Sequence, residues 1–105
     1  MLVLFDQGTP VGIRHSLRNH TVKTAHELGW NTLLNGELLR AAEESGFDVF
    51  VTTDKNLVHQ QNLQARRLAI VVLGQARWSL IKPLLDRVRE TIDEAKPGTY
   101  TLIEM

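Results

Sequence analysis

The stretch Val49-Phe50-Val51-Thr52-Thr53-Asp54 decides the fold and the expected site. Four residues of high β propensity lead into a second threonine and then a carboxylate. This pattern predicts a strand that is buried on both faces and emerges at Asp54. Because parallel sheets bind ligands at the carboxyl ends of their strands, Asp54 is the first candidate for a functional residue.

A second run of the same design lies at the amino terminus, where Leu2-Val3-Leu4-Phe5 is followed by Asp6. If the two strands are neighbours, Asp6 and Asp54 converge on one edge of the sheet. A third acid, Glu37, lies in the first turn of an expected helix and borders its apolar face beside Ala41. From that position we expect Glu37 to reach the same edge.

The rest of the chain alternates strand and helix patterns. We expect strands at residues 2–5, 21–24, 49–52, 69–73 and 100–103, and helices at about 10–19, 36–45, 55–64 and 79–95. Thr9 and Asn35 are the predicted N-caps of the first two helices. Such alternation predicts crossover connections and a mostly parallel sheet covered on both faces, a three-layer α/β/α sandwich. The length of 105 residues predicts a single domain, 1–105.

Composition narrows the function classes. The chain is 43% hydrophobic and 23% charged, which is typical of a globular protein. It contains no cysteine, so disulfides and thiolate metal sites are excluded. Twelve basic residues balance twelve acidic ones, which argues against binding nucleic acid over the whole surface. No apolar run reaches the roughly 18 residues that span a bilayer, and no signal peptide is evident, so we expect a cytoplasmic protein without membrane contact.

The three acids suggest metal chemistry. Asp6, Glu37 and Asp54 offer only oxygen ligands, which suit a hard cation such as Mg²⁺. A bound ion would relieve their mutual repulsion and activate water for attack on a phosphodiester. Each acid also has a simpler explanation, since a strand-end aspartate often caps the next helix and a first-turn glutamate favours the helix dipole.

Polar residues around Asp54 are candidates for binding a phosphate or an RNA backbone. Thr53 could bond a phosphate, Lys55 could offset negative charge, and Gln61 and Arg66 lie in a polar, basic segment. Local backbone bonding and a solvated helix face explain the same residues without a ligand.

Three segments together resemble the small PIN-like proteins, a bacterial branch of the PIN nuclease superfamily. They are residues 4–10 (LFDQGTP), residues 35–43 (NGELLRAAE) and residues 47–57 (FDVFVTTDKNL), and the similarity continues to about residue 74. The resemblance implies a PIN-like sandwich and RNA cleavage dependent on Mg²⁺ or Mn²⁺, with Asp6, Glu37 and Asp54 on positions of the acidic cluster. Many such proteins carry a further acid where this chain has Asn56, a neutral ligand. Many are also toxins held inactive by an antitoxin, so an antitoxin-like partner is an expectation, and a homodimer stays open.

Two other functions remain open. Neutral Asn56 and the absence of a basic groove in the sequence favour a binding module that keeps the fold without turnover. A phosphoacceptor receiver domain is the other, because Asp54 follows the third strand and the pair Lys82-Pro83 is present. A receiver, however, needs an acidic pair after the first strand, and Asp6 is followed by Gln7.

Overall fold

A computed structural model describes residues 1–57 and 66–105 of the chain. In these ranges the apolar runs form five strands at the predicted positions. They are β1 (Leu2–Phe5), β2 (Thr21–Thr24), β3 (Val49–Thr52), β4 (Ala69–Leu73) and β5 (Tyr100–Ile103). Every residue of β3 and β4 is buried, as continuous apolar runs predict for central strands.

The described strands form one sheet in the order β2-β1-β3-β4-β5, and every neighbouring pair is parallel. The predicted α/β class is therefore confirmed, with a sheet that is wholly parallel over the described ranges. This strand order is that of a doubly wound sheet whose direction of winding reverses between β1 and β3.

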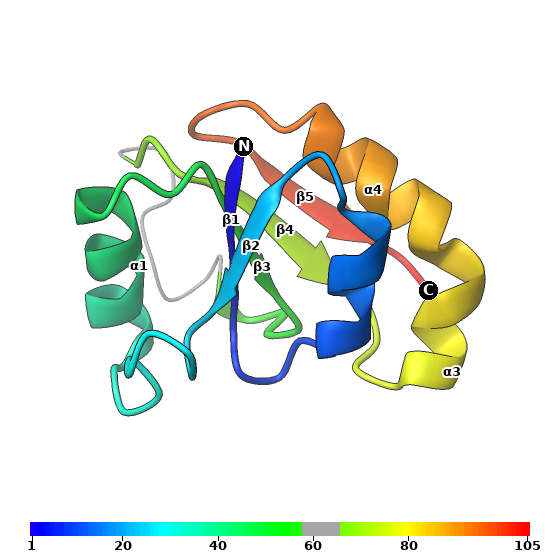
Figure 1. The fold of residues 1–105 in the computed structure, drawn as a ribbon, viewed down its shortest axis with the longest axis horizontal. Helices are drawn as coiled ribbons and strands as arrows, with labels where there is room; N and C mark the ends of the chain where they lie inside the picture. The colour runs from blue at the N-terminus through cyan, green and yellow to red at the C-terminus, as the bar shows by residue number, and fades with distance from the viewer. Residues whose placement is uncertain (58–65) are drawn as a thin grey trace.

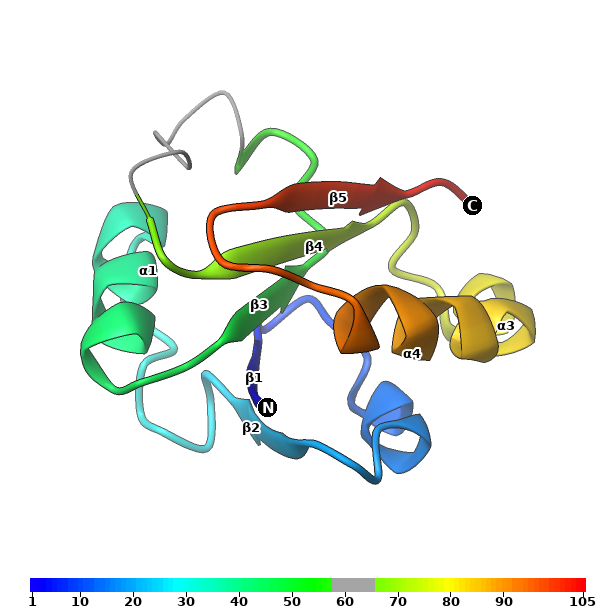
Figure 2. The same cartoon turned by 90° about the horizontal axis from the view of Figure 1, so that it is seen from above.

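Alternation along the strands divides the core into two layers. One side chain in two from β1, β3 and β4 joins a cluster with the helical residues Ile13, Ile81, Val88 and Ile92. The intervening side chains pack on the opposite face against Leu38, Leu39 and Ala42. Figures 1 and 2 show the corresponding layers, with α1 (Asn35–Glu44) on one side of the sheet. On the other side lie the 3₁₀ helix at Val11–Ser16 together with α3 (Trp78–Ile81) and α4 (Leu85–Asp93).

The helices differ from the prediction at their starts. The first is a short 3₁₀ helix with Pro10 as its N-cap, because the Thr9 hydroxyl donates to the Val51 carbonyl at 3.0 Å instead of capping. Helix α1 begins at Asn35 itself, with Leu34 as N-cap. The last predicted helix is interrupted by a 3₁₀ segment, Lys82–Leu84, at Pro83, whose ring nitrogen has no hydrogen to donate. Of the helix expected at 55–64, residues 58–64 lie outside the described ranges.

One crossover has an unusual hand. The connections β2→β3 and β4→β5 advance in the same direction across the sheet, yet the first runs over the face of α1 and the second over the opposite face. They therefore have opposite hands, and Figures 1 and 2 show that β4→β5 is the left-handed one. Parallel crossovers are right-handed in about 98% of cases. As a result, α4 packs beside the 3₁₀ helix of the first crossover.

No helix in residues 1–57 and 66–105 is both long enough and apolar enough to cross a membrane.

An ion pair joins α1 to the segment that enters β4. The Glu43 carboxylate accepts from the Arg66 guanidinium and, at 2.9 Å, from the backbone N–H of Arg67. Both side chains of the pair are largely buried, at 18% and 19% exposed. Desolvation acts to raise the pKa of Glu43, but the bonds from Arg67 and Arg66 outweigh it, so the pKa lies below its ordinary value.

We predict that Glu43→Gln lowers the free energy of unfolding by about 1–3 kcal/mol at pH 7, because Arg66 loses a charged partner. A lowered folded-state pKa means that the ionised carboxylate stabilises the fold above the unfolded pKa, and that this stabilisation is lost as the pH falls through the folded pKa. The difference between wild type and variant in urea unfolding should therefore be constant near neutral pH and shrink in acid. The exposed neighbour Glu44→Gln is the control, and an equal loss there would contradict the assignment.

Candidate functional site

The point where the winding of the sheet reverses lies between β1 and β3, and in sheets of this kind ligands bind there, outside the carboxyl ends of the strands. Asp6 follows β1 directly and Asp54 follows β3 after Thr53. The parallel register pairs Phe5 with Val51, and the Asp6 backbone N–H extends that pairing by donating to the Val51 carbonyl at 2.9 Å. The register therefore sets both acids at the carboxyl ends of β1 and β3, which form the rim of the candidate site.

Asp6 is half-buried and both of its carboxylate oxygens accept a hydrogen bond. Oδ1 accepts from the backbone N–H of Gln7 at 2.8 Å, and Oδ2 accepts from the hydroxyl of Thr52 at 2.8 Å. These bonds fix the carboxylate while leaving each oxygen a further lone pair for a ligand.

Thr52 links the two acids. Its hydroxyl donates to Asp6 Oδ2 and accepts from the backbone N–H of Asp54 at 3.1 Å, and its side chain is fully buried. A threonine at the end of a strand is often explained by β propensity alone. Here the hydroxyl connects the carboxyl ends of β1 and β3, a role that the sequence signal did not reveal.

Asp54 is held by neutral donors. Its Oδ1 accepts from the backbone N–H of Asn56 at 2.9 Å, and its Oδ2 accepts from the side-chain amide of Asn35 at 3.2 Å. Sequence reasoning took Asn35 for a helix cap, but its amide instead joins the start of α1 to Asp54. Asn35, like Thr52, has a role at this site that the sequence did not reveal.

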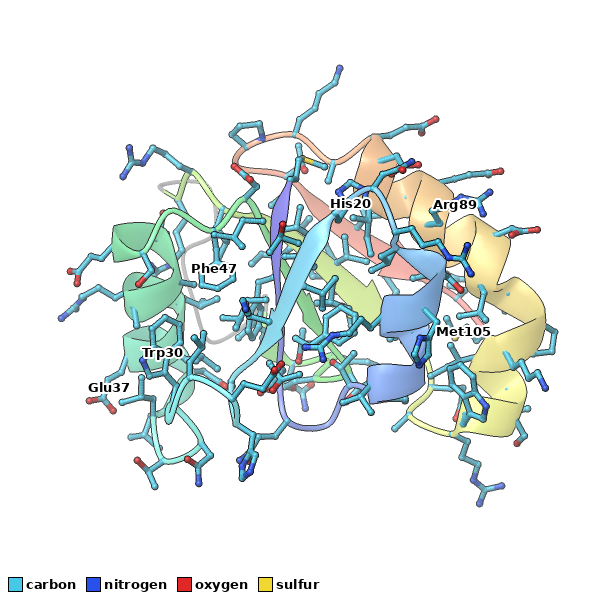
Figure 3. All side chains as sticks on the ribbon, in the orientation of Figure 1. His20, Trp30, Glu37, Phe47, Arg89 and Met105 are labelled. Atoms are coloured by element: carbon cyan, nitrogen blue, oxygen red, sulfur yellow. The ribbon has the colours of Figure 1, made fainter. Side chains whose placement is uncertain are left out.

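Glu37 does not join the other two acids. Its side chain is exposed and its carboxylate accepts from the backbone N–H of Leu34 at 3.3 Å, which is the reciprocal half of a capping box. Figure 3 shows Glu37 pointing outward from the end of α1, away from the sheet. The expectation that Glu37 reaches the sheet edge is therefore corrected, because a local bond to the helix start holds it outside.

Of the candidate phosphate-binding residues, some lie at the rim and others do not. Thr53 lies at the rim, with its hydroxyl 2.8 Å from the place where a β-carbon on Gly8 would lie, so the loops after β1 and β3 are in close contact. Lys55 is exposed and lines a pocket of about 280 Å³ at the ends of β4 and β5. Arg66 precedes β4 and so lies at the amino ends of the strands, opposite the rim, where it pairs with Glu43. Gln61 lies outside the described residues.

In the described part of the chain, no group of three or more acidic, histidine or cysteine side chains could hold an ion together. Two carboxylates, Asp6 and Asp54, remain at the rim with the amide of Asn35 beside them. Mg²⁺ typically takes one or two carboxylates and keeps several waters, so this donor set fits a hydrated Mg²⁺ or Mn²⁺ ion.

Comparison with protein-family models, with curated proteins and with solved structures found no match.

We predict that Thr52→Val lowers the free energy of unfolding by about 1–3 kcal/mol, because it leaves Asp6 Oδ2 and the Asp54 N–H without their common partner. Valine keeps the shape and β propensity of threonine, so the effect reports the hydroxyl. Urea unfolding measures the loss, and faster hydrogen exchange at the Asp54 amide locates it. Thr21→Val, on the exposed side of β2, is the control and should stay within about 0.5 kcal/mol of wild type. An unchanged Asp54 amide would contradict the proposed link.

Proposed function

We propose that this protein is a divalent-metal-dependent ribonuclease whose ion is held by Asp6 and Asp54. The observation that carries the proposal is the Thr52 hydroxyl, which bonds the Asp6 carboxylate and the Asp54 backbone N–H and so joins the two acidic residues at the point where the winding of the sheet reverses. Two carboxylates that face one ligand site repel each other unless a cation lies between them. The resemblance to PIN-like proteins supports RNA as the substrate.

Each residue has a definite role in this proposal. Asp6 and Asp54 would hold the ion. Thr52 orients the Asp6 carboxylate through its hydroxyl and fixes the Asp54 backbone by accepting from its N–H. Asn35 restrains the Asp54 carboxylate through a hydrogen bond from its side-chain amide. Thr53, whose hydroxyl lies close to Gly8, would donate to a phosphate oxygen. Mg²⁺ or Mn²⁺, when bound, supplies Lewis-acid activation of water and charge neutralisation for phosphodiester hydrolysis.

A binding module without turnover is the second candidate. The observation in its favour is that the partners of Asp54, Asn35 and Asn56, are neutral, and that Glu37 lies apart from the rim. Such a module keeps the ion and the fold and acts in a complex. A regulatory partner of the antitoxin kind belongs to either version of the proposal.

A phosphoacceptor receiver is disfavoured by the position of Lys82. The strand order is shared with receiver-like sheets. However, Lys82 lies in the 3₁₀ segment between α3 and α4 and follows no strand, while β5 is followed by Glu104 and Met105. Lys82 therefore does not take the position directly after a strand that a receiver requires.

We predict that Asp6→Asn and Asp54→Asn each lower Mg²⁺- or Mn²⁺-dependent cleavage of a fluorogenic RNA by at least about 100-fold, because each removes a charged ligand of the ion. Asp86→Asn is the matched control, since that side chain is 86% exposed on α4, and its rate should be unchanged. Undiminished cleavage in both rim variants would reject the ribonuclease. Mn²⁺ binding without any cleavage by the wild type would instead support the binding module.

We further predict that Glu37→Gln leaves the cleavage rate within about twofold of wild type and only weakens the start of α1 by about 0.3–1 kcal/mol. The rate assay separates the acid that the structure places outside from the two at the rim. A loss in Glu37→Gln as large as that in Asp54→Asn would return Glu37 to the metal site.

A further inference from the structure

A pocket of about 600 Å³ opens beside Asp6, at the carboxyl ends of β1 and β2. This volume lies within the range of about 300–1,000 Å³ that small-molecule sites occupy. The side chains that matter for its chemistry are Asp6, Gln7, Val11, Arg14, His26 and Glu27. Apart from Asp6, the proposed function assigns none of them a role.

The charges of the pocket disfavour an anion. Two carboxylates, Asp6 and Glu27, face one guanidinium, Arg14. That guanidinium is already engaged, since it donates to the Glu27 carboxylate and, at 3.1 Å, to the Val22 carbonyl. The group that enters this pocket is therefore not an anion and presents hydrogen-bond donors.

Glu27 is a prepared acceptor. Its Oε1 accepts from Arg14 and, at 3.0 Å, from the backbone N–H of Thr24, while the Glu27 N–H donates back to the Thr24 hydroxyl at 3.0 Å. The side-chain bond from Arg14, followed by the backbone bond from Thr24, lowers the pKa of Glu27, so the carboxylate stays ionised. Among residues 1–57 and 66–105, no donor is recorded for Oε2.

The pocket also offers surfaces for a flat ligand. Val11 is 62% exposed and presents an apolar side chain at its wall. The side chain of Arg14 is 38% exposed, and its planar guanidinium is held in one orientation by its two acceptors. Nucleic-acid bases stack on arginine planes and on apolar side chains in this way.

We propose that this pocket binds a nucleobase with an N–H donor edge, guanine above all, from the RNA strand beside the phosphodiester that is cleaved. Guanine presents an imino N–H and an amino group side by side, and both can donate to the lone pairs of Glu27 Oε2, the carboxylate oxygen that is not already bonded to Arg14 and Thr24. Uracil presents a single N–H between two carbonyl oxygens, which a carboxylate repels. The origin of the base in RNA rests on the proposed function, whereas the base preference of the pocket stands on its own contacts.

The test measures binding of free guanosine and uridine to the full chain in EDTA, by chemical-shift perturbation of backbone amides. Neither nucleoside carries a phosphate, and without a divalent ion no cleavage takes place. We expect guanosine to bind at least about tenfold more tightly than uridine and to shift the amides of Gln7 and His26. Inorganic phosphate, the third probe, should leave these amides unshifted.

Two variants separate recognition from folding. Glu27→Gln should abolish the preference for guanosine. Glu90→Gln, at an exposed position of α4, should keep that preference. Because Glu27 also supports Arg14, Val11→Trp provides a second route, since its ring fills the pocket and should weaken guanosine binding at least about tenfold. Leu80→Trp is its control, an exposed apolar position on α3 that does not line this pocket.

The outcomes distinguish the pocket from the catalyst. Equal binding of the two nucleosides, or a guanosine preference that survives in Glu27→Gln, overturns the proposed pocket. RNA cleavage by a wild-type protein that does not bind guanosine rejects the pocket and leaves the ribonuclease standing. Guanosine binding lost in Val11→Trp, in a protein that cleaves no RNA with Mn²⁺, supports the pocket and rejects the ribonuclease.

Discussion

The rest of the structure depends on the parallel pairing of β1 with β3. Its last element is the Val51 carbonyl, which accepts both the Asp6 backbone N–H at 2.9 Å and the Thr9 hydroxyl at 3.0 Å. One acceptor thus fixes the chain as it leaves β1 and again as it turns into the 3₁₀ helix. With the register fixed, the buried hydroxyl of Thr52 meets Asp6. Backbone pairing alone therefore sets the position of the rim, independently of the side chains of the site.

Polar groups at this rim satisfy one another in a chain. Gln7 and Thr52 donate to Asp6, and the Asp54 backbone donates to Thr52. Asn35 then donates to Asp54 from the start of α1. Every donor in this series of hydrogen bonds is neutral. The negative charges of Asp6 and Asp54 are therefore oriented but not neutralised. That combination of fixed orientation and uncompensated charge is what a hard cation requires.

β1, β3 and β4 could be predicted because they are largely continuous apolar runs, and Asp6 and Asp54 because each follows such a run closely. The helix starts could not. A helical wheel places Glu37 near the apolar face, but the bond from the Leu34 N–H to its carboxylate decides where the side chain points. The sequence predicts Asn35 as a helix cap. Only the packing of α1 against β3 shows that its side-chain amide donates to Asp54. Long-range contacts of this kind leave no periodic trace in a sequence.

The left-handed return to β5 has a consequence for how the chain folds. It lays α4 on the same face as the 3₁₀ helix of the first crossover, so Val88 and Ile92 share a cluster with Ile13. The last third of the chain thus completes the layer that the first residues begin. Contacts this distant in sequence carry a high loop-closure cost before they are rewarded, which slows folding. An amino-terminal fragment emerging from the ribosome would expose Ile13 until the final helix arrives, so this layer forms last.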